Sequence, residues 1–139
     1  MIALVCGWHP DHPRSSAEFG RRLSRGEELV VAAPALVEAY SVLTRIPPPY
    51  RITPTDALLL LESNFIGERR LVSLLDSAYK SLLRESAGLG ITGGKIYDAV
   101  IAECAVQAGV DTLLTLNERH FQDLARNRLK MIVPGKRIG

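Results

Sequence analysis

Apolar positions along the chain fall into short unbroken runs and longer stretches with helical spacing. Four runs are bounded by charged or turn-forming residues, as is typical of strands covered on both faces: residues 29–33, 71–74, 112–115 and 130–133. Six stretches between and around them predict helices: residues 14–25, 35–44, 53–65, 76–87, 95–108 and 121–125. Because helices and strands alternate, the pattern predicts an α/β fold with a mainly parallel sheet.

Prolines, glycines and one threonine place the helix ends. Pro34 directly follows the first run, and proline costs no hydrogen bond at the first position of a helix. Thr53 precedes Pro54 and is a candidate cap, with Asp56 able to reach back toward the cap amide. We expect Gly109 to end the helix at 95–108.

Length and composition are those of one domain. A chain of 139 residues with 47% hydrophobic content has room for a single core, so we expect one domain over residues 1–139. Cys6 and Cys104 lie in apolar surroundings without the spacing of zinc ligands, which predicts two buried thiols in a reducing, cytoplasmic protein. Residues 1–7 are too short for a signal peptide, and no stretch reaches the length that crosses a membrane.

Charge changes this picture only at the carboxyl end. The chain has 17 Lys and Arg against 15 Asp and Glu, too small an excess to indicate a nucleic-acid partner. From residue 119 onward, however, the chain has one acidic residue, Asp123, and six basic residues: Arg119, Arg126, Arg128, Lys130, Lys136 and Arg137. This tail is either a solvated terminus or a phosphate-binding segment, and the sequence leaves both open.

Three residues stand where an apolar run gives way to a turn or a first helical turn. They are Glu38, Asp98 and Asn117. Because the carboxyl ends of parallel strands meet at one edge of a sheet, we expect these residues to converge, and oxygen ligands of this kind suit Mg²⁺ or Mn²⁺. Singly, each has an ordinary alternative: Glu38 facing solvent, Asp98 as a helix cap and Asn117 as a turn former.

Other polar residues lie close to these in sequence. Thr115 lies on the same side of its strand as Asn117, while Arg119 and His120 follow it and could grip a phosphate or simply be surface residues. The segment His9-Pro10-Asp11-His12-Pro13 suggests a transition-metal site, but its two prolines favour a polar loop between helices.

Three segments together resemble a known family. Residues 33–44, 93–102 and 112–121 are similar in content and order to PIN-domain nucleases, in particular VapC-type toxins of bacterial toxin–antitoxin pairs. The likeness extends over nearly the whole chain and includes the loop at 9–13. It implies a Rossmann-like three-layer sandwich with a mainly parallel central sheet, and a metal-dependent endoribonuclease that forms a homodimer and binds a small antitoxin.

The resemblance also implies roles for residues. Glu38 and Asp98 would bind Mg²⁺ or Mn²⁺, Asn117 would bind it directly or through water, and Thr115 would orient that shell. The reaction would be hydrolysis of an RNA phosphodiester. The candidate RNA-contacting residues are Arg45, Lys95, Arg119 and His120.

One departure from the family pattern affects activity. Family members begin with a strand that ends in an aspartate, which would fall at or just before Met1, and no acid here precedes Asp11. Either the chain starts late, so that the first strand is missing and residues 1–5 are the helix after it, or the copy is degenerate. Both explanations predict that the 139-residue chain is a weak or inactive enzyme. The alternative function is a module that binds RNA or an antitoxin without cutting.

Two further expectations concern partners. A nucleotide-binding α/β domain is disfavoured, because the chain has neither a GxGxxG nor a P-loop sequence. We expect self-association through the apolar side chains of the helices at 35–44 and 53–65, because one small sheet face would not cover them all: Leu36, Tyr40, Leu43, Leu58, Leu61 and Phe65.

Overall fold

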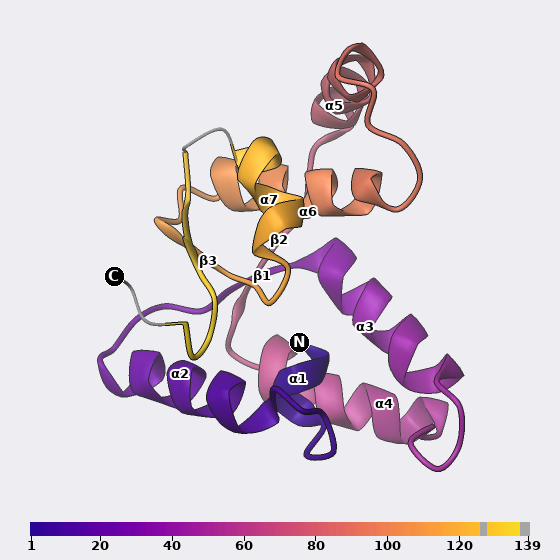
Figure 1. The fold of residues 1–139 in the computed structure, drawn as a ribbon, viewed down its shortest axis with the longest axis vertical. Coiled ribbons are helices and arrows are strands. Elements are labelled where there is room, and N and C mark those ends of the chain that lie inside the picture. Colours follow the sequence, from indigo (N-terminus) through magenta and orange to yellow (C-terminus); the bar gives the residue numbers. More distant parts are fainter. Residues whose placement is uncertain (126–127, 137–139) are drawn as a thin grey trace. The chain divides into compact units, whose positions relative to one another are not determined.

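The computed structural model describes residues 1–125 and 128–136 (Figure 1). Contacts divide the chain into two compact units, residues 1–71 (unit 1) and 72–139 (unit 2).

Unit 1 is mostly helical. Its elements are α1 (Ile2–Val5), α2 (His12–Ser24), β1 (Val30–Ala32), α3 (Ala33–Arg45), α4 (Pro54–Leu61), the π-helical η1 (Glu62–Ile66) and β2 (Arg70–Val72), which ends at the unit boundary. Helices α3 and α4 pack against each other, and α1 contacts both α2 and α3. One apolar core holds the unit together, formed by Cys6, Val31, Leu36, Ala39, Leu43, Ala57, Leu61 and Phe65.

Helix α4 shows how local sequence sets its two ends. The Thr53 hydroxyl accepts a hydrogen bond from the Asp56 amide at 3.1 Å and donates one to the Asp56 carboxylate at 2.7 Å. The predicted cap is therefore confirmed, although the Asp56 side chain binds the Thr53 hydroxyl and not the Thr53 amide. At the other end, Ser63 and Asn64 donate side-chain hydrogen bonds to the carbonyls of Leu59 and Leu60. Such bonds compete with the helical ladder, and here the helix continues as a π-helical turn.

Unit 2 contains the second helical pair and a parallel strand pair. Its elements are α5 (Asp76–Gly88), α6 (Lys95–Gln107), β3 (Thr112–Leu114), α7 (Glu118–Ala125) and β4 (Lys130–Ile132). β3 and β4 are parallel, with Thr112 opposite Lys130 and Leu114 opposite Ile132. α6 contacts both α5 and α7. Gly90 and Gly109 have φ of 67° and 69°, a conformation that glycine adopts without strain. Helices α5 and α6 can therefore end just before these two glycines.

The order and approximate bounds of the predicted elements are confirmed. α2 begins at His12 and α7 at Glu118, each a little earlier than expected, and the apolar start of the chain is the helix α1. The predicted parallel pairing is found between β3 and β4. The described strands form two two-stranded sheets, β1–β2 and β3–β4. A three-layer sandwich around one central sheet, the absence of its first strand and a single domain over 1–139 therefore stay predictions.

The reasoning behind self-association was wrong for four of its six residues. Leu36, Leu43, Leu61 and Phe65 are buried in the core of unit 1 itself, because α3 and α4 cover one another. Tyr40 and Leu58 are exposed, as expected. Self-association stays a prediction, with a smaller apolar surface to support it.

None of the helices in the described part of the chain combines the length and the apolar character needed to cross a lipid bilayer.

Candidate active site

Asp98 lies in the first turn of α6, where the chain leaves the Gly93-Gly94 turn. The amides of Ile96 and Tyr97 bond to the carbonyls of Gly93 and Gly94, which fixes the start of the helix. Farther along, α6 is held in place by its buried residues Ala99, Val100, Ala102, Cys104 and Ala105. The Asp98 side chain is 20% exposed, so its carboxylate is rigidly held yet accessible to a ligand.

His120 contacts Asp98 directly. Its Nδ1 lies 3.1 Å from Oδ2 of Asp98, and the imidazole is 51% exposed. The contact joins the first turn of α7 to the first turn of α6, two helices that pack together. His120 therefore holds one carboxylate oxygen of Asp98, in addition to lying near the surface as expected.

Asn117 lies in the turn between β3 and α7, a few residues before His120. Its backbone shapes that turn, because its amide donates to Thr115 Oγ1 at 3.0 Å and its carbonyl accepts from the His120 amide at 2.9 Å. Its side chain makes no hydrogen bond among the described residues. The turn is thus built without the Asn117 side-chain amide, while Thr115 supports the turn.

Glu38 lies in unit 1, in α3, and is exposed. Burial lowers the pKa of the Met1 amino group, and the negative charge of Glu38 opposes that shift. Because Glu38 belongs to unit 1 and Asp98 and Asn117 to unit 2, the convergence of all three stays a prediction.

The candidate RNA-contacting residues are on the surface. Arg45 ends α3, Lys95 begins α6 and Arg119 lies in the first turn of α7, and all three are exposed. They come from three different helices, and their contact with RNA stays a prediction.

The basic tail is less basic than its sequence indicates. Lys136 pairs with Glu118, and the Arg128 guanidinium lies 3.5 Å from the Glu103 carboxylate. Counting charge from residue 119 onward missed both acids, because each lies earlier in the sequence. Arg126 and Arg137 lie outside the described residues.

In the segment at 9–13, residues 9–11 form a polar turn between α1 and α2, and His12 and Pro13 begin α2. His12 Nδ1 lies 3.0 Å from the Ala3 carbonyl, and the Asp11 amide donates to His9 Nδ1 at 3.1 Å. The Asp11 carboxylate binds the Arg14 guanidinium at 2.6 Å. Within residues 1–125 and 128–136, no three His, Cys, Asp or Glu side chains are grouped so as to hold a metal ion.

Both cysteines are buried free thiols, as predicted. Burial raises the pKa of Cys6 and of Cys104, and the Glu103 carboxylate adds to the rise at Cys104. Thiols in this state are poor nucleophiles and poor metal ligands near neutral pH, because both tasks need the thiolate.

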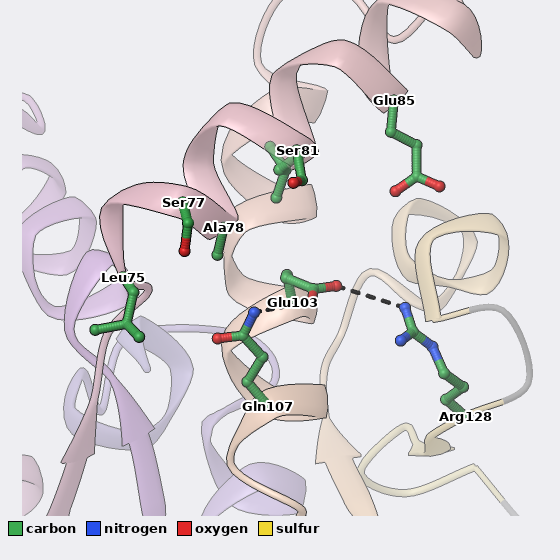
Figure 2. Close-up of a pocket in the computed structure, with 9 residues that line it drawn as sticks. Leu75, Ser77, Ala78, Ser81, Glu85, Glu103, Gln107 and Arg128 are labelled. Carbon is green, nitrogen blue, oxygen red and sulfur yellow. Dashed lines mark hydrogen bonds and ion pairs between the residues drawn. The ribbon is translucent and has the colours of Figure 1, made fainter.

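A groove of about 360 Å³ in unit 2 was not predicted (Figure 2). Ser77, Ser81 and Glu85 of α5 line it, together with Glu103 and Gln107 of α6 and Arg128. Gln107 donates to Glu103 at 3.2 Å, and Glu103 also pairs with Arg128, so these three lining residues are joined by polar contacts. The sequence held one sign of this groove, because Glu103 is an acidic residue in the middle of a mostly apolar helix. No candidate site residue lines the groove.

Comparison with known proteins decides the family. A family model for the PIN domain matches residues 1–127, which span both units. The chain belongs to the PIN domain family. It is also 35% identical over 131 residues to Ribonuclease VapC40 of Mycobacterium tuberculosis, a match that covers 94% of this chain and 91% of the relative.

A second relative of this PIN-domain chain is Ribonuclease VapC27 of Mycobacterium tuberculosis H37Rv. The two are 36% identical over 106 residues, which cover 76% of this chain and 72% of the relative. No solved structure matches the chain significantly. The α/β class and the VapC-type resemblance are thus confirmed.

Proposed function

We propose that this PIN-domain chain is a metal-dependent endoribonuclease that hydrolyses RNA phosphodiesters and acts as the toxin of a toxin–antitoxin pair. Its near full-length similarity to a protein named Ribonuclease VapC40 supports the reaction class. The structural observation that carries the proposal is the Asp98 carboxylate, held by His120 at 3.1 Å yet still partly exposed at the start of α6.

The proposed ligands are Glu38, Asp98 and Asn117. Their chemistry fits a hard divalent cation, because they supply two carboxylates and an amide oxygen, and the Asn117 side chain makes no hydrogen bond among the described residues. A bound Mg²⁺ or Mn²⁺ would lower the pKa of a water molecule and neutralise charge that builds up on the phosphate.

The chain's own residues would orient these ligands and the RNA. His120 fixes Oδ2 of Asp98 and so restricts rotation of the carboxylate. Thr115 fixes the turn that carries Asn117. Arg45, Lys95 and Arg119 would bind RNA phosphates, and an arginine can do so through two parallel hydrogen bonds.

A module that binds RNA or an antitoxin without cutting is the second candidate. It is favoured by the small number of acids, because the proposed ligand set has only two carboxylates. In either form we propose a cytoplasmic protein that binds a cognate antitoxin and self-associates as a homodimer.

Incubation of the chain with end-labelled RNA tests the proposal. We expect shorter fragments with Mg²⁺ or Mn²⁺ and none with excess chelator, at a rate that is low if two carboxylates hold the cation weakly. Cleavage that persists in chelator would contradict a metal-dependent reaction. RNA retarded on a native gel but never cut in Mn²⁺ would support the binding module in its place.

A further inference from the structure

Two exposed aromatic rings are stacked on unit 1. The Trp8 and Tyr50 ring centroids are 4.5 Å apart, with an angle of 27° between the planes. Trp8 lies in the turn after α1 and Tyr50 in the loop between α3 and α4. Although large aromatic side chains are usually mostly buried, Trp8 is 41% exposed and Tyr50 48%.

Hydrogen bonds hold both turns in place. The Tyr50 amide donates to the Pro47 carbonyl at 3.2 Å. The next residue, Arg51, donates from its Nε to the Ile46 carbonyl at 3.0 Å. The His9 amide, next to Trp8, donates to the Cys6 carbonyl at 2.9 Å. The rings are thus positioned before any ligand arrives, which lowers the entropic cost of binding.

The chain segment that carries Tyr50 is positively charged. Between Glu38 and Asp56 the charged residues are Arg45 and Arg51, both exposed. The acid nearest to Trp8 in sequence, Asp11, is neutralised by Arg14 at 2.6 Å. No carboxylate in the described part of the chain pairs with Arg45 or Arg51. An anionic ligand with flat apolar groups fits both features.

We infer that Trp8 and Tyr50 form a stacking platform for an unpaired base of single-stranded RNA, with Arg51 beside a neighbouring phosphate. The inference rests on the proposed function and adds where the strand is held. Every base has a flat face that stacks on an aromatic ring, and the phosphates supply the negative charge that the two arginines attract. Bases in a duplex are stacked on each other, so the platform selects single strands.

Tyr50 lies in the loop beyond the carboxyl end of α3, whereas Glu38, the proposed metal ligand of the same unit, lies near the middle of that helix. Arg45, next to the loop that carries Tyr50, is about 10 Å along α3 from Glu38 at the usual helical rise. Trp8 and Tyr50 are positioning residues, which hold the strand and are not catalytic.

Trp8 is the only tryptophan of the chain, so its fluorescence reports on the platform directly. The metal-free chain in excess chelator is titrated with a single-stranded RNA of about ten nucleotides and with the same RNA as a duplex. We expect the single strand to quench Trp8 emission and the duplex to leave it unchanged. Unchanged emission throughout the titration with single strands would overturn the inference.

Substitutions make the test specific. Tyr50→Leu should weaken binding of a labelled single strand, measured by anisotropy, by about fivefold or more, and Tyr50→Phe should keep the wild-type affinity because it keeps the ring. Tyr79→Leu, which removes a tyrosine that is 38% exposed on α5, is the matched control and should bind as wild type. Equal affinities of Tyr50→Leu and wild type would also overturn the inference.

These results separate the platform from the proposed function. Quenching without any cleavage in Mn²⁺ would support the platform and contradict the nuclease. Metal-dependent cleavage with no effect of RNA on Trp8 would support the nuclease and overturn the platform.

Discussion

Asp98→Asn should lower the rate of metal-dependent RNA cleavage by at least about 100-fold. The substitution keeps the size of the side chain and an oxygen that can face His120, but removes the charge that the proposed site needs from α6. A divalent cation contributes several kcal/mol of charge stabilisation in such reactions, and each 1.4 kcal/mol is about tenfold in rate. Initial rates in Mn²⁺ measure the effect, and unchanged circular dichroism shows that the fold is retained.

Asp111→Asn is the matched control for that substitution. Asp111 directly precedes β3, whereas Asn117 follows it, so the control removes the same charge at the opposite end of one strand. We expect its cleavage rate to stay within about twofold of wild type. If both variants lost activity equally, the effect would come from net charge, and Asp98 would have no special role.

Leu43→Ala should destabilise the chain by about 2 to 5 kcal/mol. Leu43 is 1% exposed in the core between α3 and α4, and truncating it removes buried apolar contacts and leaves a cavity. Native domains have only about 5 to 15 kcal/mol of stability, so the loss is a large share of the total. Urea unfolding followed by circular dichroism measures it.

A leucine-to-alanine substitution at an exposed position of unit 1 is the control for Leu43→Ala. Leu59 in α4 is 55% exposed, and Leu59→Ala should change the free energy of unfolding by no more than about 0.5 kcal/mol. If both variants lost a similar amount of free energy of unfolding, the burial of Leu43 and the exposure of Leu59 would be contradicted.

Helix and strand positions could be predicted because they depend on neighbours in sequence. Pro34, Thr53 and Gly109 each act within one turn of their own position, and the structure places helix ends at all three. The bounds missed by a few residues where polar side chains continue or extend a helix, as at His12 and Glu118.

Contacts between elements were harder to predict. The burial of Leu36 and Phe65 depends on α4 and η1 covering α3, which no local pattern shows. The pairs Arg128–Glu103 and Lys136–Glu118 join residues that are 25 and 18 positions apart, so a count along the tail overlooked them. A charge run can therefore be neutralised by acids outside it.

The candidate site was predicted in part. Placing Asp98, Thr115 and Asn117 at a helix start and a strand end followed from the sequence, and the structure puts them there. The contact of His120 with Asp98 was not predicted, because it depends on how α7 packs on α6. Trp8 and Tyr50 were missed, because they lie 42 positions apart in loops and neither has a periodic pattern.

We propose that Glu38, Asp98 and Asn117 together bind one divalent cation. Titration of the chain with Mn²⁺, followed by electron paramagnetic resonance of the free ion, tests it without relying on cleavage. We expect one site per chain, with an affinity that falls by at least about tenfold in Glu38→Gln and, separately, in Asp98→Asn, while Asp111→Asn binds as wild type. Mn²⁺ binding that is undetectable in wild type, or equal in Glu38→Gln and wild type, would contradict it.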